Sequence, residues 1–426
     1  MNDSYSHKDI YENGIKINTK NDNNKNKKKI ILYSKNEDIK TLNIKTKRKN
    51  SKNDLNNLIE SNEKFLMDPY KNIKENKINI KIHSDPKDIQ FLKDIIEDSF
   101  DNFGLDNIFC VFKSVNNILY LIYSSLKSII CYNIIDNKKI NEIKNAHNKD
   151  ITNFRHCLDK INHRDLVISI SCDDNNIKLW NMNNLKCLLS IKNINKRGDL
   201  YSACFLNDNN QIFIITSNKC YGDTDPIKVY DLNGNKIKEI KNSNYKTFSL
   251  ETYYDNKTNK NFIIAGNVGS IISYDYNLNK IYRKYGSNNR RPYASLIINI
   301  FNFEKRIPEI RNTSNISKEI LKLIGSSYDG IIRIWNFHSG ELLRRITSSN
   351  NKIYGMCLWD NLYLFVGCYD KTIKLIDLKN GKVVKNLEGH NKDVLTIKKI
   401  IHPEYGECLI SQSLSKDQLK KWINKI

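Results

Sequence analysis

A few side chains of chemically useful types lie near one another in this sequence. His156 and Cys157 are adjacent and His163 follows, and imidazole nitrogens and thiolates are ligands that zinc prefers. The group has no matched second pair, so we expect it to be structural rather than a metal site. Asp173 and Asp174 form a pair of carboxylates. Adjacent residues of a strand point to opposite faces, so we expect these two to form a turn rather than a catalytic pair.

No motif for a cofactor or a nucleophile accompanies these residues. The sequence contains no glycine-rich phosphate loop and no Gly-x-Ser-x-Gly turn of the kind that exposes a nucleophilic serine. We therefore expect no enzymatic activity, no cofactor and no metal, and a function in binding.

The charge of the chain suggests nucleic-acid binding. Its 426 residues include 69 Lys and Arg against 47 Asp and Glu, a formal net charge of +22, and a strongly basic protein attracts phosphate groups. The basic residues are spread along the sequence, however. Lys, Asn, Ile and Tyr can all be encoded by A and T alone, so an A+T-rich, protist-like genome would raise the lysine content without selection for binding. We expect mostly solvated background charge and keep a functional basic surface as the alternative.

The cysteines and the apolar runs bear on the compartment. No two of the ten cysteines lie within ten residues of each other, so no paired redox or zinc motif is present. Reduced cysteines in apolar runs fit the cytoplasm, the nucleus or both. No run of about 18 uncharged apolar residues occurs and the N-terminus is polar, so we expect neither insertion into a membrane nor a secretory signal.

Composition divides the chain near residue 76. Residues 1–76 are rich in Asn, Lys, Asp and Ser, so we expect a largely disordered, basic N-terminal tail of low complexity. From residue 77 onward, short runs of Ile, Val, Tyr and Phe alternate with turns rich in Asn, Asp, Gly and Ser, which predicts an all-β domain over 77–426. Residues 88–103 are an exception, because Ile89, Leu92 and Ile96 have helical spacing and predict a short helix.

A repeat runs through the second region. The sequences Ile-Lys-Leu-Trp-Asn at 177–181, Ile-Ile-Arg-Ile-Trp-Asn at 331–336 and Ile-Lys-Leu-Ile-Asp at 373–377 match one another, and each follows an Asp placed six residues before the aromatic position. Looser copies complete the series. The aromatic positions are held by Tyr132, Trp180, Tyr230, Tyr274, Trp335, Ile376 and Trp422. Their spacing of 41 to 61 residues indicates seven units.

These motifs resemble the WD-repeat β-propeller family, without indicating a subfamily. The resemblance covers about residues 77–426, and Gly389–His390 and Ala146–His147 resemble the Gly-His pair that begins a blade in that family. The resemblance implies seven four-stranded blades around a channel. The expected fold is therefore a seven-bladed WD-repeat β-propeller preceded by the disordered tail.

The resemblance also implies a hydrogen-bonded chain in each blade, which joins a His, a turn Asp, a strand Ser or Thr and the Trp. Such a buried network fixes the register of the strands, because an unpaired member is costly. In unit two, Cys172 stands where the hydroxyl is expected and Ser171 is one residue away, and in unit seven Asp417 is one residue late. We assign to this structural network His147, Asp174, Trp180, Ser327, Asp329, Trp335, Asp370, His390 and Trp422.

Closure of the ring requires one more strand than the last unit contains. The chain ends four residues after Trp422, and a propeller with an unfinished last blade has an open edge. The alternating residues 77–82, Lys-Ile-Asn-Ile-Lys-Ile, are our candidate for the closing strand. The long spacing before Trp335 predicts an insertion over residues 301–317, in an exposed loop.

A binding surface is expected where the turns between second and third strands gather with the loops that lead into the blades. By the register of the repeat, Tyr328 and Tyr369 directly precede their turn Asp and point to this face. Tyr and Arg are enriched at binding hot spots, although an A+T-rich code also favours Tyr. The candidate partner-binding residues are Tyr201, Arg290, Arg291, Tyr328, Tyr354 and Tyr369.

Three functional hypotheses follow. The first is a non-catalytic protein-interaction scaffold or adaptor, a monomeric propeller within a larger protein assembly. The second is an RNA-associated component of a ribonucleoprotein complex. The third, a ubiquitin-ligase substrate receptor, is weaker, because Lys379 matches the receptor motif but Ile376 replaces its Trp. Leu343–Ile346 (Leu-Arg-Arg-Ile) resembles a lipid-binding motif of one propeller subfamily but lacks its glycine, so we expect an outer strand there.

Overall fold

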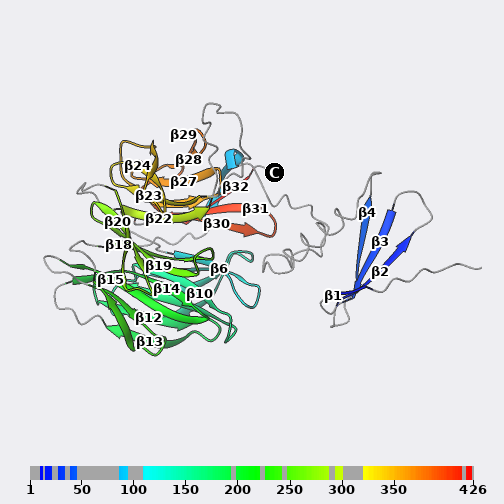
Figure 1. Cartoon of the computed structure of the whole chain (residues 1–426), viewed down its shortest axis with the longest axis horizontal. Coiled ribbons are helices and arrows are strands. Elements are labelled where there is room, and N and C mark those ends of the chain that lie inside the picture. The colour runs from blue at the N-terminus through cyan, green and yellow to red at the C-terminus, as the bar shows by residue number, and fades with distance from the viewer. Residues whose placement is uncertain are drawn as a thin grey trace, which may run out of the picture. The chain divides into compact units, whose positions relative to one another are not determined.

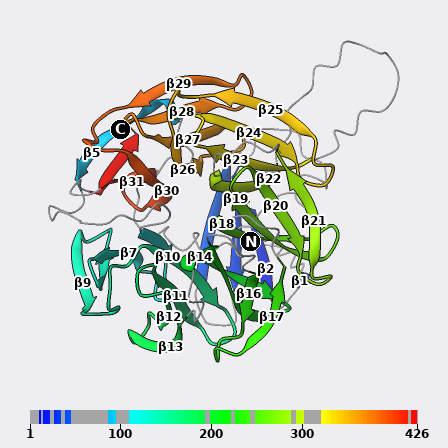
Figure 2. The same ribbon diagram turned by 90° about the vertical axis from the view of Figure 1, so that its left-hand side faces the viewer.

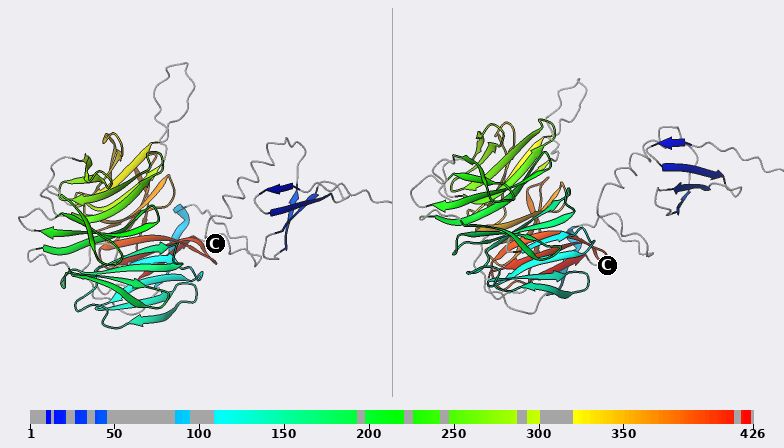
Figure 3. Two further views of the ribbon diagram at one scale, coloured as in Figure 1. Left: turned by 60° about the horizontal axis from the view of Figure 1, so that its bottom comes forward. Right: turned by 90° about the horizontal axis from the view of Figure 1, so that it is seen from below.

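The computed structural model divides the chain into two compact units, Met1–Ile78 and Asn79–Ile426. It describes residues 10–12, 15–21, 27–33, 39–45, 86–94, 109–192, 198–220, 226–241, 247–286, 293–300, 320–414 and 419–424. The first unit contains β1 (Ile10–Glu12), β2 (Ile15–Asn21), β3 (Lys27–Tyr33) and β4 (Ile39–Lys45), which pair in that order as an antiparallel sheet (Figure 3). The expected disordered tail over 1–76 otherwise lies outside the described residues.

The second unit is a seven-bladed β-propeller, as the sequence predicted (Figures 1 and 2). Each blade is a four-stranded antiparallel sheet, and in the first six blades the strands pair in sequence order. The inner strands are buried runs of Ile, Val, Leu and Phe, because each sheet packs both faces against neighbouring blades. The fourth strand of each blade is the outermost in Figure 2 and contains both basic and apolar residues.

The first four blades have these bounds. Blade one consists of β6 (Phe109–Lys113), β7 (Leu119–Ser125), β8 (Ser128–Asn133) and β9 (Lys138–Ile143). Blade two consists of β10 (Asn153–Asp159), β11 (Arg164–Ser171), β12 (Asn176–Asn181) and β13 (Lys186–Lys192). Blade three consists of β14 (Gly198–Asp208), β15 (Gln211–Cys220), β16 (Ile227–Tyr230) and β17 (Lys236–Ile240). Blade four consists of β18 (Thr247–Asp255), β19 (Lys260–Asn267), β20 (Ser270–Asp275) and β21 (Lys280–Tyr285).

The remaining three blades complete the ring. Blade five consists of β22 (Tyr293–Ile300), β23 (Leu321–Ser327), β24 (Ile331–Asn336) and β25 (Leu342–Thr347). Blade six consists of β26 (Ile353–Leu358), β27 (Tyr363–Cys368), β28 (Ile373–Asp377) and β29 (Lys382–Leu387). Blade seven consists of β30 (Val394–His402), β31 (Gly406–Ser413), β32 (Lys420–Asn424) and β5 (Ile89–Asp94). The expected insertion at 301–317 falls between β22 and β23 and lies outside the described residues.

Blade seven is closed by a strand from the start of the propeller, but not by the strand that we predicted. β5 follows a short 3-10 turn, Pro86–Asp88, and pairs antiparallel with β32. The edge of β32 is thus taken by residues 89–94, and residues 77–82 lie outside the described residues. The predicted helix over 88–103 is wrong for residues 89–94. Pairing satisfies the backbone of the open edge and buries Ile89 fully, while the Phe91 ring packs edge-on against Trp422.

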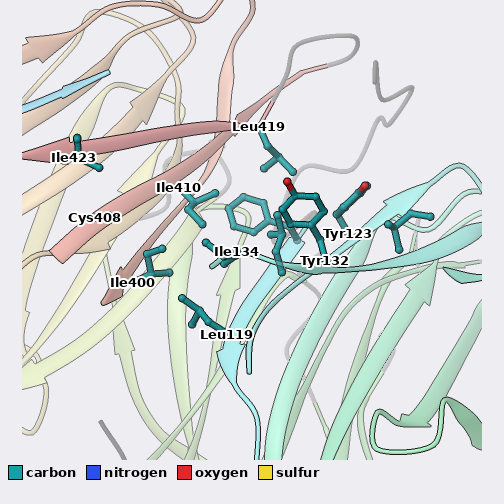
Figure 4. Packing of buried hydrophobic residues seen from close by; sticks show 12 residues of the cluster. Leu119, Tyr123, Tyr132, Ile134, Ile400, Cys408, Ile410, Leu419 and Ile423 are labelled. Atoms are coloured by element: carbon teal, nitrogen blue, oxygen red, sulfur yellow. The ribbon is translucent and has the colours of Figure 1, made fainter. Parts of the chain in front are cut away.

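The hydrophobic core lies between the blades rather than in one central cluster. At the closing junction, Ile400, Cys408 and Ile410 of blade seven pack against Leu119 and Tyr132 of blade one (Figure 4). Equivalent clusters join the other blades. The ring is therefore held together by seven similar interfaces, as expected for a repeat architecture.

A β-bulge marks the aromatic position of every unit. In all seven blades, the pairing of the third with the outer strand shifts by one residue at the aromatic position of the repeat. The seven units assigned from sequence are thus structurally equivalent. The extra residues on the outer strands are all apolar or aromatic: Leu92, Ile140, Leu188, Ile237, Tyr282, Leu343 and Val384.

The residue after the bulge connects one blade to the next in three places. Lys238 donates to the carbonyl of Tyr276 at 3.0 Å. Arg344 donates to the carbonyls of Leu378 and Lys379 at 2.8 and 2.7 Å. Lys385 donates to the carbonyl of Lys87, in the 3-10 turn before the closing strand β5, at 2.6 Å. Part of the basic charge of the chain therefore has a structural role.

Candidate functional site

The structural network of blade two is present, but its hydroxyl belongs to Ser169 and not to Ser171. Ser169 accepts the indole N–H of Trp180 at 2.8 Å and lies 2.7 Å from Nε2 of His147. Trp180 pairs with Val167, and Ser169 is the diagonal neighbour on the same face of the sheet. Ser171 is two residues further along β11, too far to reach the indole, and Cys172 instead contacts Thr152. Ser169 is eleven residues before Trp180.

Asp174 completes this network electrostatically. Its Oδ2 is 3.7 Å from Nδ1 of His147 and accepts the backbone N–H of Asn148 at 3.1 Å. Burial lowers the pKa of His147 to about 4, against the opposing effect of Asp174. The imidazole is therefore neutral at physiological pH, and the nearby carboxylate favours its proton on Nδ1.

Blade seven repeats the arrangement. Ser411 accepts the indole N–H of Trp422 at 2.7 Å and lies 2.7 Å from Nε2 of His390. Ser411 is again eleven residues before the Trp. Asp417 lies outside the described residues. The spacing of eleven is the sequence signal that would have located both hydroxyls.

Blades five and six replace the histidine by a cation. Asp329 accepts two bonds from Arg333, at 3.2 and 2.7 Å, and Asp370 lies 2.8 Å from Lys374. In blade five the register places Gly325 where blades two and seven have the serine, so Ser327 does not occupy the network position next to Trp335. These assigned residues hold turns and do not form the expected chain.

The chemically suggestive group in blade two is structural. Nε2 of His156 is 2.9 Å from Oδ1 of the buried Asp165, and the imidazole stacks on Phe112 with centroids 3.7 Å apart. Asp165 also accepts the backbone N–H of Val115 from blade one at 2.9 Å. His156 and Asp165 thus join two blades. Within the described residues, no three His, Cys, Asp or Glu side chains are grouped to hold a metal ion.

The described cysteines are free thiols, and most are buried. Burial raises the pKa of Cys131 and Cys408 to about 12 and that of Cys357 to about 11. A thiol with such a pKa carries almost no thiolate at neutral pH, and the thiolate is the nucleophile. These side chains act as small apolar core residues.

Three of the predicted partner-binding tyrosines come together on blades five and six. The Tyr328 ring meets the Tyr354 ring edge-on, with centroids 5.6 Å apart. The ammonium of Lys352 lies 5.2 Å from the Tyr328 centroid and 5.6 Å from the Tyr369 centroid. Tyr369 is 47% exposed and Tyr354 only 5%. We call Tyr328, Lys352, Tyr354 and Tyr369 the Tyr-Lys cluster.

The Tyr-Lys cluster is positioned by tight backbone contacts. The N–H of Tyr369 donates to the carbonyl of Lys352 at 2.9 Å. Gly330, two residues after Tyr328, has a φ of +75°, and a Cβ there would collide with the carbonyl oxygen of Ser349. Only glycine allows this turn to lie so close to the loop that leads into blade six.

Blade seven contributes an acidic residue to the base of the Tyr-Lys cluster. The Tyr354 hydroxyl lies 3.5 Å from Oδ2 of Asp393. Burial, together with Tyr328, Asp393 and Tyr369, raises the pKa of Tyr354, so its hydroxyl stays protonated and donates to the carboxylate. Burial also raises the pKa of Asp393. Lys352 is not a sequence-predicted site residue; its signal is its place two residues before Tyr354, at the start of blade six.

The other predicted partner-binding residues are not brought into this cluster. Tyr201 lies in β14 of blade three, and its side chain is outside the described part. Arg290 and Arg291 lie outside the described residues. Among the described residues, no helix has the length and apolar character needed to cross a bilayer.

Comparison with known proteins gives partial matches. No family model matches the chain. Myosin heavy chain kinase C of Dictyostelium discoideum is 28% identical over 75 residues, which is 18% of this chain and 9% of that protein. Autophagy-related protein 16 of Arabidopsis thaliana is 21% identical over 178 residues, 41% of this chain and 31% of that protein. The U3 small nucleolar RNA-associated protein 21 homolog of Schizosaccharomyces pombe is 25% identical over 92 residues, 22% of this chain and 10% of that protein.

A solved structure supports the fold. The crystal structure of Chaetomium thermophilum Raptor superposes with a TM-score of 0.56 and 14% identity, over 79% of this chain and 29% of that chain. The matches span less than a third of each of these proteins. The chain is therefore a seven-bladed β-propeller with relatives of WD-repeat type.

Proposed function

We propose that this protein is a non-catalytic interaction scaffold that binds protein partners through the Tyr-Lys cluster. The observation that carries the proposal is the exposed Tyr369, packed with Tyr328 around the ammonium of Lys352. Tyrosines held in place bring a large contact area at a low entropic cost, and they are enriched among the residues that dominate binding energy.

The rest of the molecule supports a scaffold. The buried histidines and aspartates serve turns and blade junctions, and burial keeps the thiols protonated. A rigid ring whose blades are joined by side chains and backbone presents its loops in fixed positions, which reduces the entropy lost on binding. We propose that the protein works as a monomeric propeller within a larger assembly, in the cytoplasm or the nucleus, where free thiols persist.

The test is an affinity purification of the tagged full chain, at ~0.1 M and ~0.5 M salt with nuclease treatment. The double variant Tyr328→Ala, Tyr369→Ala should recover at least about tenfold less of each partner than the unchanged chain does, as expected for two hot-spot residues. Tyr254 is a matched control, since it is 46% exposed and lies in blade four. Tyr254→Ala should leave the partner set unchanged.

Two results would refute this assignment. One is an unchanged partner set with the double variant. The other is equal loss with the double variant and with Tyr254→Ala, which would show a general effect of removing exposed tyrosines. Thermal unfolding of each variant verifies that the propeller is intact.

A further inference from the structure

Part of the basic charge of the propeller lies on its outer strands. The outer strands of blades four, five and six, which follow one another along the ring in Figure 2, contain no acidic residue. Their basic residues are Lys280, Arg283, Lys284, Arg344, Arg345, Lys382 and Lys385. The outer strands of three consecutive blades thus carry seven positive charges, a grouping that the sequence alone did not reveal.

Six of these seven side chains divide into two groups by direction, and the seventh, Arg283, is half-buried beside the Tyr282 ring. Arg344 and Lys385 donate to backbone carbonyls of the next blade. Lys280, Arg345 and Lys382 are exposed. The outward group, which also includes the exposed Lys284, is called the basic arc.

The outer strands of blades one and three, unlike those of the basic arc, contain acidic residues that pair with their lysines. In blade one, Lys139 pairs with Glu142 at 2.6 Å, and in blade three Lys236 pairs with Glu239 at 2.6 Å. Blades four to six have no such acidic partner within the outer strand; blade two also has none, but its outer strand carries only two lysines. Glu341 and Glu388 in the flanking loops are exposed, and Asp275 and Asp377 pair in register with Lys280 and Lys382, so the seven basic residues face four nearby acidic ones.

We propose that the basic arc binds the phosphate backbone of single-stranded nucleic acid, independently of sequence. This surface is separate from the Tyr-Lys cluster, and the inference does not depend on the scaffold function. Basic side chains that follow one another along a surface neutralise successive phosphates and release their counterions, which provides most of the affinity of sequence-independent binding. Phosphate is the group recognised, so RNA and DNA are both candidates.

The geometry favours a flexible strand over a lipid surface. The basic arc runs along the convex outside of the ring (Figure 2). A flat bilayer touches a convex wall along a narrow strip and so meets the charges of few blades at once, whereas a single strand can bend from one blade to the next. Four aliphatic side chains are exposed between the charges, Ile281, Leu342, Val383 and Val384, but the arc has no exposed Trp or Phe of the kind that anchors proteins in a bilayer interface.

The test uses the purified full chain and fluorescein-labelled oligonucleotides of twenty uridines or twenty thymidines, with anisotropy as the readout. The variant carries Lys280→Glu, Arg345→Glu and Lys382→Glu, one change on each blade of the basic arc. The control carries Lys127→Glu, Lys149→Glu and Lys160→Glu, three exposed lysines outside the outer strands. Both variants have the same net charge, so the total charge of the molecule cancels in the comparison.

We expect the arc variant to bind at least about tenfold more weakly at ~0.1 M salt and the control by less than about twofold. The slope of log K against log salt should fall by about 2 in the arc variant, since each phosphate contact on a single strand contributes about 0.7. A preference of the unchanged chain for uridine or thymidine oligonucleotides assigns RNA or DNA.

Several results would overturn the proposal. No binding by the unchanged chain at ~0.1 M salt would do so, as would equal weakening in both triple variants, which would indicate the overall charge. Unchanged oligonucleotide binding by the arc variant, with loss of co-sedimentation on phosphatidylserine vesicles, would instead assign the arc to an anionic membrane. Thermal unfolding confirms that both variants are folded.

Discussion

The Ser169 hydroxyl accepts the indole N–H of Trp180 at 2.8 Å and lies 2.7 Å from the imidazole of His147. One buried oxygen thus joins the third strand, the second strand and the loop that leads into blade two. Ser411 does the same for Trp422 and His390 in blade seven. The two networks lie in different blades, so each one can be tested by itself.

Ser169→Ala should lower the stability of the propeller by about 1–3 kcal/mol, because it leaves two buried polar groups without their shared partner. Ser171→Ala is the matched control in the same strand. Its hydroxyl is buried and forms no hydrogen bond in the structure, so its removal should be neutral or slightly stabilising. Denaturant unfolding of both variants measures the difference, and equal effects would show that the network does not contribute.

Stability should depend on pH through His147. Its folded pKa of about 4 is below the ordinary value of 6.5 because of burial. Above pH 6.5 the imidazole is neutral in both the folded and the unfolded chain. As the pH falls from 6.5 through 4, the unfolded chain takes up the proton first, so the free energy of unfolding decreases by up to about 3 kcal/mol. His147→Gln should flatten the melting temperature across this window. His163 is exposed, and His163→Gln should leave the slope as it is; a slope retained by H147Q would contradict the assignment.

Closure of the ring should depend on β5. A chain that lacks residues 1–82 keeps Ile89 and Phe91 and should melt within a few degrees of the full chain. A chain that lacks residues 1–94 exposes the edge of β32 and the indole of Trp422, and should melt far lower or aggregate. Calorimetry of the two truncations makes the comparison. A large fall in the melting temperature after removal of residues 1–82 would indicate instead that residues 77–82 close the ring.

The contact between blades five and six provides a test with adjacent residues. Arg344→Gln removes two charge-assisted bonds to carbonyls of the next blade and should cost about 1–3 kcal/mol. Arg345→Gln changes an exposed neighbour and should stay within about 0.5 kcal/mol. The order should reverse for oligonucleotide binding, in which Arg345 takes part. Identical stability of the two variants would show that the bonds of Arg344 are replaced by water.

Gly330→Ala should disturb both stability and the Tyr-Lys cluster. The new methyl group would meet the carbonyl oxygen of Ser349, and the φ of +75° is strained for any other residue. Gly381 has a similar φ of +70°, but its nearest neighbour, in the flexible Arg344, is 3.6 Å from the ideal Cβ. Gly381→Ala therefore isolates the backbone strain. The additional loss of stability in Gly330→Ala, relative to Gly381→Ala, measures the cost of the collision. An equal loss of stability in the two variants would show that the contact with the loop leading into blade six does not constrain residue 330.

The sequence was sufficient for the architecture. The aromatic positions from Tyr132 to Trp422 recur once per unit, and all seven lie at the same β-bulge of their blades. This succeeds because the strands of each of the first six blades come from one unit and pair in sequence order, so the sequence pattern of a unit is set locally. Tyr328 and Tyr369 were placed on one face for the same reason.

The closing strand could not be derived locally. Ile89, Leu92 and Ile96 fit a helix as well as a strand, and the choice depends on β32, more than 300 residues away in sequence. The unpaired backbone of that edge decides the conformation of residues 89–94, which no periodicity can show.

The hydroxyls and the charges were also decided by tertiary structure. Ser169 and Ser171 lie on the same face of one strand, and only the register opposite Trp180 selects between them. The basic residues are spread along the sequence, but the ring places seven of them on the outer strands of three successive blades. The sequence by itself determined the repeat, because a blade is a local unit. Tertiary structure alone decided closure, register and the clustering of charge, because these depend on which strand edges and which blades become neighbours.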